Sequence, residues 1–301
     1  MYSEKIKYSF IIPTYNSEKT IFKCLNSVLN QESCDYEVLI IDDGSTDNTL
    51  NIVTELSKKN DKIKIKKNSH KGISEIRNIG ICNSIGDYII FVDSDDYVNS
   101  ELLSVLNKYD DDVIKFSVFC SNGGDRFVQP KFISITGMEC LKLFCNSENI
   151  FATPWGYAFR RSLFLNNKLF FLKGKTHEDF GLIPLVLIYA KTVSSIEYVG
   201  YNYIKRVGSI TQETEYEKEI SRMYDFIDQF CFVIGSLNNM NIEQLYKKIY
   251  NDYFINRLYI KFNNFKRNIK EYYDYDEVVK KCCKKINTFL IRQKLNYRKF
   301  T

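Results

Sequence analysis

The sequence predicts an α/β fold in which a mostly parallel sheet is flanked by helices and followed by a helical C-terminal extension. Over about the first 100 residues, short β-branched apolar runs alternate with stretches of helical periodicity. This β-α-β-α order is typical of parallel strands joined by crossover helices. From residue 215 onward the strand patterns end and only helical periodicity remains.

Each apolar run gives one expected element. In the first third, strands are expected over residues 9–15, 36–43, 62–66 and 87–93, and helices over 19–31, 46–60 and 74–85. Further on, strands are expected over 113–119, 126–135, 155–160 and 193–203, and helices over 217–235, 242–262 and 276–293. We place a domain boundary near residue 212. The first turn, PTYNSEKT, lacks a G-x-G-x-x-G pattern, so a Rossmann dinucleotide site is not expected.

Composition excludes several classes of protein. Hydrophobic residues make up 45% of the chain and charged residues 26%, as in globular domains. No run approaches about 18 apolar residues, and the polar start does not match a signal peptide. The nine cysteines form no C-x-x-C pair and there are only two histidines, which argues for reduced thiols and against a zinc site. We therefore expect a cytoplasmic protein without a membrane-spanning helix.

The net charge of +5 is unevenly distributed. In residues 242–301, basic residues exceed acidic ones by about nine. A basic amphipathic helix can lie on an anionic membrane, so peripheral membrane contact is one expectation for this region. The helical spacing of its aromatic residues fits ordinary core packing equally well. No nucleic-acid-binding module is recognisable, and we expect no nucleic-acid partner.

Polar residues follow three of the expected strands, where ligands bind in open parallel sheets. Asp93 and Asp95 come after the strand YIIFV, in a spacing that suits a divalent cation and a ribose. Asp43 follows the strand YEVLII, where a carboxylate can accept a hydrogen bond from a base. Acidic turns that cap the next helix produce the same patterns.

The four segments IIPTYN, VLIIDDGSTD, HKGISEIRNIG and YIIFVDSDD, in this order, resemble family 2 glycosyltransferases, enzymes of the Rossmann-like GT-A fold. The resemblance is close over residues 8–100 and looser to about residue 210. It implies an inverting enzyme that uses a nucleotide-sugar donor, commonly UDP-activated, and a divalent cation, Mn²⁺ or Mg²⁺.

The resemblance also implies roles for particular residues. Asp95 would hold the metal. The implied donor-binding residues are Pro13, Thr14 and Tyr15 along the nucleotide, Asp43 at the base, Arg77 at the pyrophosphate and Asp93 at the ribose. The nucleotide-sugar-binding part would then span about residues 1–110, and the acceptor and catalytic part about 111–212.

The second half contains His177-Glu178-Asp179 directly before an apolar helical run. This resembles the Glu-Asp pair of the family, which makes Asp179 the expected base for the acceptor hydroxyl. An acidic pair that complements a helix dipole would have the same appearance. Trp155, Glu178 and Arg206 are further candidates for contact with acceptor or phosphate, although Trp155 also suits a core and Arg206 a solvated loop.

The sequence thus predicts an inverting transferase that moves a sugar from a UDP-sugar to a hydroxyl of a glycan or lipid-linked acceptor, in the assembly of a bacterial surface polysaccharide. Membrane contact would place it at the inner face. A nucleotidyltransferase is an alternative, but a basic glycine-rich loop after the first strand is missing. A non-catalytic nucleotide-sugar-binding scaffold is another, disfavoured because Asp93, Asp95 and Asp179 are all present.

Overall fold

A computed structural model describes residues 5–33, 35–121, 126–127, 130–146, 152–205, 215–272, 274–295 and 300. The strands are β1 (Tyr8–Thr14), β2 (Tyr36–Asp42), β3 (Ile63–Lys67), β4 (Tyr88–Phe91), β5 (Tyr97–Val98), β6 (Val113–Cys120), β7 (Arg126–Phe127), β8 (Phe132–Ile135), β9 (Tyr157–Arg160) and β10 (Val193–Tyr203). The helices are α1 (Ile21–Leu29), α2 (Thr49–Lys59), α3 (Ile73–Asn83), α4 (Leu102–Leu106), α5 (Gly137–Cys145), α6 (Arg161–Asn166), α7 (Glu178–Tyr189), α8 (Tyr216–Asn239), α9 (Gln244–Asn268) and α10 (Tyr275–Arg292).

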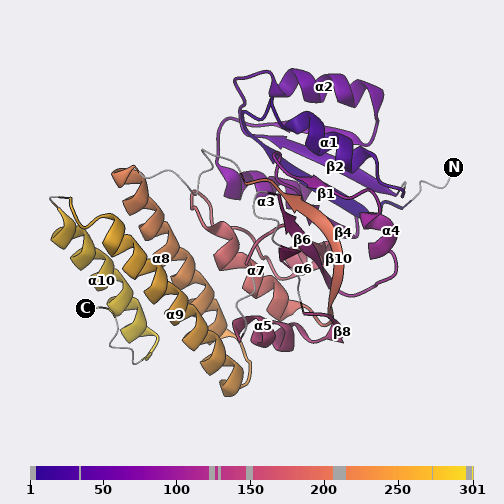
Figure 1. Ribbon diagram of the computed structural model, residues 1–301. Helices are drawn as coiled ribbons and strands as arrows, with labels where there is room; N and C mark the ends of the chain where they lie inside the picture. The colour runs from indigo at the N-terminus through magenta and orange to yellow at the C-terminus, as the bar shows by residue number, and fades with distance from the viewer. Residues whose placement is uncertain are drawn as a thin grey trace.

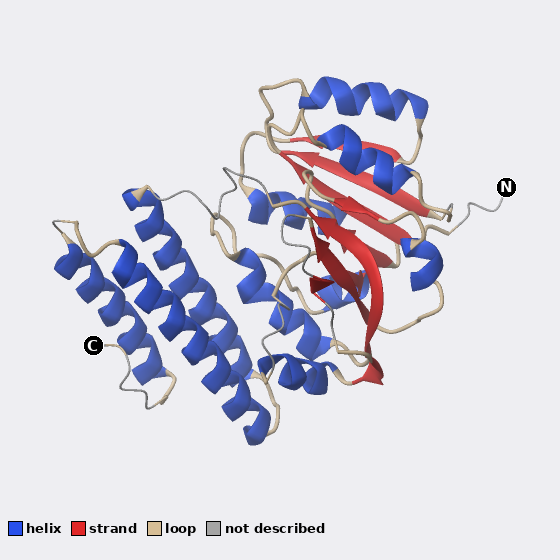
Figure 2. Cartoon of the chain, in the orientation of Figure 1, coloured by secondary structure: helices blue, strands red, loops and turns tan. Residues whose placement is uncertain are grey.

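The strands form one twisted sheet in the order β3-β2-β1-β4-β9-β6-β10-β5. The pairs β2–β3, β1–β2, β1–β4 and β6–β10 are parallel, whereas β9 runs antiparallel to both β4 and β6. The expected mostly parallel sheet is confirmed, and β9 joins its two parallel halves. Figure 2 shows the strands of this sheet in red, between helices.

Helices cover both faces of the sheet, as expected (Figure 1). Successive side chains of a strand point to opposite faces. On β1, Phe10 and Ile12 belong to the apolar cluster under α1, α2 and α4, whereas Ile11 belongs to the cluster under α3, α5, α6 and α7. Gly80 of α3 brings that helix close to β1, since a Cβ there would lie 2.4 Å from the Ile11 side chain.

The three C-terminal helices α8, α9 and α10 form a further layer against α7 and α5 (Figure 1). Their buried residues belong to the same apolar cluster as those of α3, α5, α6 and α7, so the core continues from the sheet into the helical region. The three helices expected here are confirmed. Among the helices in the described part of the chain, none combines the length and apolar character needed to cross a bilayer.

The structure corrects some expected elements between residues 126 and 166. The strand expected over 126–135 is two short strands, because β7 pairs with β6 whereas β8 pairs with β10. The hydrophobic pattern did not predict α5 or α6. A local signal for α5 was present: Thr136 caps the helix and Glu139 completes a reciprocal capping box.

Candidate active site

The polar residues that follow β1, β2 and β4 meet at one edge of the sheet, as the parallel pairing requires. We call Pro13–Tyr15, Asp43 and Asp93–Asp96 the carboxyl edge. The backbone N–H of Asp43 donates to the carbonyl of Thr14 over 2.8 Å, which links the first two strand ends. Thr14 is itself buried, and its hydroxyl donates to the carbonyl of Ile12.

Asp43 is buried and holds the loop that leads into α3. Its carboxylate accepts hydrogen bonds from the backbone N–H groups of Lys71 and Gly72. The His70 ring lies beside it, with 3.5 Å between Nδ1 and Oδ2 of Asp43. Tyr15 is 47% exposed, and its ring centroid is 4.5 Å from that of His70. An aromatic pair therefore flanks Asp43, a suitable place for a planar base. His70 was not among the residues predicted from the sequence.

The three carboxylates after β4 have different environments. Asp93 is ion-paired with Arg77 at 2.8 Å, while Asp95 is partly buried. Asp96 is buried and accepts hydrogen bonds from the Tyr201 hydroxyl at 2.6 Å and from the backbone N–H of Ile204 at 2.7 Å. Burial, and then the negative charges of Asp93 and Asp95, raise the pKa of Asp96 to about 8. Asp96 thus ties the end of β10 to the carboxyl edge.

The carboxylates at this edge fit a divalent cation that takes its other ligands from the phosphates of a bound substrate. No cluster of three or more His, Cys, Asp or Glu side chains suited to a metal occurs in the described ranges. Asp93 and Asp95 nevertheless concentrate negative charge at a partly exposed strand end, and this charge adds to the effect of burial in raising the pKa of Asp96. Mg²⁺ is typically held by one or two carboxylates together with substrate phosphates, and the edge supplies that number.

Arg77, on α3, joins the carboxyl edge to the start of α7. It is 5% exposed, and its guanidinium forms ion pairs with Asp93 and with Glu178. Burial opposes the charged form of Arg77, but the two carboxylates outweigh it and raise the pKa. The structure therefore places this side chain between two acids. Contact with a pyrophosphate, which the sequence suggested, remains a prediction.

Asp179 lies in the first turn of α7, immediately after Glu178, and is partly buried. One of its carboxylate oxygens accepts a hydrogen bond of 2.8 Å from the backbone N–H of Phe180. Burial, and next the negative charge of Glu178, raise the pKa of Asp179 to about 7, although Arg77 acts in the opposite direction. A carboxylate that takes up a proton near neutral pH is suited to general base catalysis.

Two other residues of α3 hold the segment before α7. The Ser74 hydroxyl donates to the carbonyl of Lys175 at 2.8 Å, and the Asn78 amide exchanges two hydrogen bonds with the backbone of Phe171. Ser74, Arg77 and Asn78 have the i, i+3, i+4 spacing of one helix face. Of these three residues, only Arg77 was predicted from the sequence, because nothing in the local sequence shows which segment that helix face contacts.

Trp155 stacks against two tyrosines of β10. Its ring centroid is 5.4 Å from that of Tyr201 and 5.6 Å from that of Tyr203. Because Tyr201 also donates to Asp96, the tryptophan packs next to the carboxyl edge. Trp155 is partly buried, and its contact with an acceptor or a phosphate stays a prediction. Arg206, the remaining candidate, lies outside the described residues.

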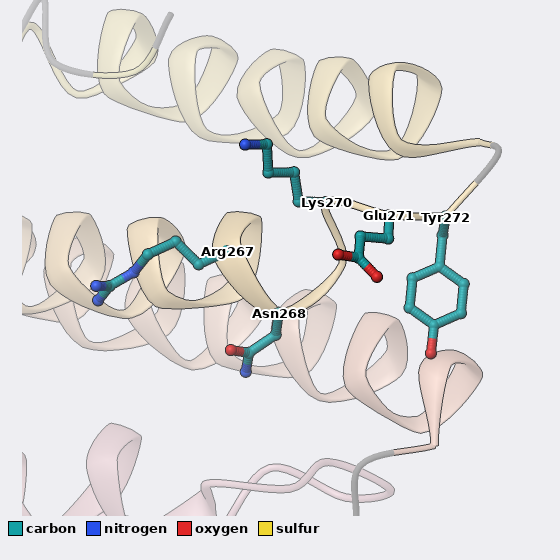
Figure 3. Close-up of a pocket in the computed structure, with 5 residues that line it drawn as sticks. All are labelled: Arg267, Asn268, Lys270, Glu271 and Tyr272. Carbon is teal, nitrogen blue, oxygen red and sulfur yellow. The ribbon is translucent and has the colours of Figure 1, made fainter.

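Two hollows on the surface belong to the helical region instead. One, of about 450 Å³, is lined by residues at the end of α9 and in the turn that follows, namely Arg267, Asn268, Lys270, Glu271 and Tyr272 (Figure 3). The other, of about 430 Å³, lies between α8 and α10 and has a basic rim that includes Lys284 and Arg292. No predicted site residue lines either of them.

The fold and the acidic edge define the GT-A class. The structure superposes on the crystal structure of residues 1–349 of Staphylococcus aureus TarS in complex with UDP-GlcNAc with a TM-score of 0.71, at 22% identity, over 97% of this chain and 93% of that one. A mannosyltransferase from Pyrobaculum calidifontis, PcManGT in complex with GDP-Man and Mn²⁺, gives 0.54 at 13% identity, with coverage of 96% and 79%. These likenesses establish the fold.

Sequence comparison establishes the family. The model of glycosyl transferase family 2 matches residues 9–166, and the chain belongs to this family. It is 30% identical over 261 residues to TarS of S. aureus strain Mu50, a poly(ribitol-phosphate) β-N-acetylglucosaminyltransferase, across 84% of this chain but 44% of that protein. It is 28% identical to a cholesterol galactosyltransferase of Borreliella burgdorferi, across 82% of this chain and 73% of the relative. The chain thus spans less than half of the length of TarS.

Proposed function

We propose that this protein is an inverting glycosyltransferase that moves a sugar from a UDP-sugar to a hydroxyl of a glycan or lipid-linked acceptor. One observation carries the proposal: Arg77 links Asp93 at the end of β4 to Glu178, the neighbour of Asp179. A donor-side carboxylate and a candidate base thereby meet in one polar cluster. Residues 1–110 would bind the donor, and residues 111–212 would supply acceptor contacts and the base.

The chain's own residues have complementary roles in this reaction. Tyr15, His70 and Asp43 would hold the base of the donor, and Asp93 its ribose. Asp179 would take the proton from the acceptor hydroxyl as that oxygen attacks the anomeric carbon from the face opposite the departing diphosphate. Glu178 pairs with Arg77, and the negative charge of Glu178 raises the pKa of Asp179, which makes Asp179 a better proton acceptor.

A metal would be held by Asp95, with Asp93 nearby and the donor phosphates completing its ligands. When bound, Mn²⁺ or Mg²⁺ would supply positive charge that stabilises the leaving diphosphate. Support comes from the carboxylate donor set and from the Mn²⁺ complex of the structurally similar mannosyltransferase.

The acceptor is proposed by class. The names of the relatives give poly(ribitol phosphate), a polymer, and cholesterol, a lipid, as acceptors. We propose a role in bacterial surface polysaccharide assembly, which the relative that acts on a polymer supports. The exposed basic face of α10, with Lys281, Lys284 and Arg292, would contact an anionic membrane. Sedimentation with phosphatidylglycerol vesicles tests this contact, and equal binding to phosphatidylcholine vesicles would contradict it.

Nucleotide binding tests the proposed function. Calorimetry with UDP, and with GDP as control, is carried out with and without Mn²⁺ on the wild type and on Asp95→Ala. We expect metal-dependent UDP binding that Asp95→Ala abolishes, and transfer or slow hydrolysis of a UDP-sugar by the wild type only. Nucleotide binding without turnover under any condition would favour a scaffold. Absence of nucleotide binding would refute the proposal.

A further inference from the structure

The turn that precedes Asp179 is held by the C-terminal helix α8. We call residues 174–179 the catalytic turn. Asp225 of α8 accepts hydrogen bonds on one carboxylate oxygen from the backbone N–H of Thr176 at 3.0 Å and from its hydroxyl at 3.2 Å. One helical turn later, the Gln229 amide donates to the carbonyl of Thr176 at 3.4 Å. Both polar groups of the Thr176 backbone are thus bonded to α8.

The next residue is packed by the same helix. The His177 ring meets the Phe226 ring edge-on, with 5.3 Å between centroids. Burial lowers the pKa of His177 to about 4, so the ring is neutral at physiological pH. Within the described residues, its Nε2 has no hydrogen-bond partner. Packing against Phe226, together with the bonds of Thr176, therefore determines where the turn lies.

The backbone of the turn is in a conformation that needs such support. His177 has φ 54° and ψ 33°, in the left-handed region, and it is the N-cap residue directly before α7. Non-glycine residues adopt this region at a cost of about 1–3 kcal/mol, and only where surrounding contacts fix them. The direction in which α7 starts, and with it the position of Asp179, depends on this one residue.

α8 packs directly against α7 at this point. A Cβ on Gly181 would lie 2.1 Å from Oε1 of Gln229, so a larger residue there would force the Gln229 side chain to move. Gln229 is fully buried, and Asp225 and Phe226 are each less than a tenth exposed. These polar and aromatic contacts continue into the apolar core through Phe226, which stacks on Phe180.

We propose that Asp225 is a positioning residue for the transfer reaction: through Thr176 and His177 it sets the geometry of Asp179. The inference rests on the proposed function, in which Asp179 is the base. Arg77 holds the turn from the α3 side through Glu178, and Asp225 holds it from the α8 side. With two fixed points on either side of His177, the carboxylate of Asp179 has one position relative to the carboxyl edge.

Asp228, one turn along α8, provides a matched control. Lys175 forms ion pairs with both acids, at 3.1 Å to Asp225 and 2.9 Å to Asp228, and Lys285 of α10 also pairs with Asp228. Asp225→Ala and Asp228→Ala therefore both remove a partner of Lys175. Only Asp225→Ala removes the hydrogen bonds to Thr176.

The experiment compares three quantities in these variants: kcat for turnover of a UDP-sugar, the KM for that UDP-sugar, and amide hydrogen exchange over residues 174–182. Asp225→Ala should lower kcat by about 10- to 100-fold, because a small displacement of a catalytic group costs that much. The donor KM should change less than about twofold, because the carboxyl edge is untouched. Exchange over the turn should rise in this variant alone. Asp225→Asn should recover most of kcat, since its amide oxygen can still accept from Thr176.

The outcomes distinguish a positioning role for Asp225 from a merely structural role and from a failure of the transferase assignment. Equal kcat in Asp225→Ala and Asp228→Ala, or unchanged exchange over the turn, would overturn the positioning role while the transferase assignment stands. A loss of kcat in both variants that follows a shared loss of melting temperature would show a merely structural role. No turnover by the wild type under any condition would refute the transferase assignment, and this inference with it.

Discussion

The carboxyl edge and the catalytic turn are built in different ways. At the carboxyl edge, Thr14 ends β1, Asp43 and Asp93 come after β2 and β4, and strand pairing brings them together. The catalytic turn is held instead by side chains from α3 and α8 that lie 49 to 101 residues away in the sequence. The first region inherits its geometry from the sheet, whereas the second depends on how two helices pack around it.

This difference predicts that changes in the two regions affect separate kinetic constants. Replacements at the carboxyl edge should weaken donor binding, because we propose that these residues hold the nucleotide. Replacements in the catalytic turn should lower kcat with donor binding preserved. Arg77 belongs to both regions and should affect both constants.

The largest effect is expected for Asp179→Asn. General base catalysis contributes about 10²- to 10⁴-fold, so kcat should fall by about that factor while UDP affinity is unchanged. The raised pKa of Asp179 means that the folded protein binds a proton more tightly than the unfolded chain. Stability is therefore lost as pH rises from about 4 to 7, and the variant should melt higher than the wild type at pH 8. A fall in UDP affinity equal to the fall in kcat would contradict the expected separation between residues that bind the donor and residues that set kcat.

Arg77→Lys should have the next largest effect. Lysine is a point charge and cannot bridge two carboxylates as the planar guanidinium does. Leaving a buried carboxylate unpaired costs about 3–5 kcal/mol, so melting temperature, kcat and UDP affinity should all fall together. Arg160→Lys is the control, because Arg160 also pairs with two acids, Asp110 and Asp112, but is more exposed. Similar losses of kcat in both variants would contradict a special role for Arg77.

The pH dependence of kcat gives a smaller effect. Asp179 must be ionised to accept a proton, and its pKa is raised to about 7. Between pH 6 and pH 8, kcat should therefore rise about tenfold, with a midpoint near 7. The measurement is a kcat profile at saturating donor and acceptor. A profile that falls with pH over this range would exclude Asp179 as the base.

The smallest effect is expected for Tyr15→Ala. An aromatic contact contributes about 0.5–1.5 kcal/mol, so the donor KM should rise about 2- to 10-fold with little change in kcat. Phe22→Ala is a suitable control, since Phe22 is 58% exposed on α1. An unchanged Kd for UDP in Tyr15→Ala would contradict the proposal that the aromatic pair of Tyr15 and His70 holds the base of the donor.

The same contrast explains what the sequence could and could not predict. The strands and helices of the first third follow from hydrophobic periodicity, and Asp43, Asp93 and Asp95 follow from their place after apolar strands. Asp179 was predictable from its position before an apolar helix and from the family likeness.

The contacts that hold Asp179 were not predictable. Ser74 and Asn78 contact the segment before α7 only because α3 and α7 cover the same face of the sheet. In the sequence, Asp225 cannot be distinguished from the other acidic residues of its helix. Its contact with the turn follows only from the packing of α8 against Gly181. Periodicity reports which side of a helix is buried, but it contains no information about which segment lies against that side.

The close contact between Gly181 and Gln229 has a consequence for protein engineering and for evolution. Grafting α8 to α10 from a relative onto this chain would separate Asp225, Phe226 and Gln229 from the turn that they contact. A productive chimera would have to inherit residues 171–182 and 215–237 from the same parent. The segments that must be exchanged together therefore lie on both sides of the apparent boundary between the sheet domain and the C-terminal helices.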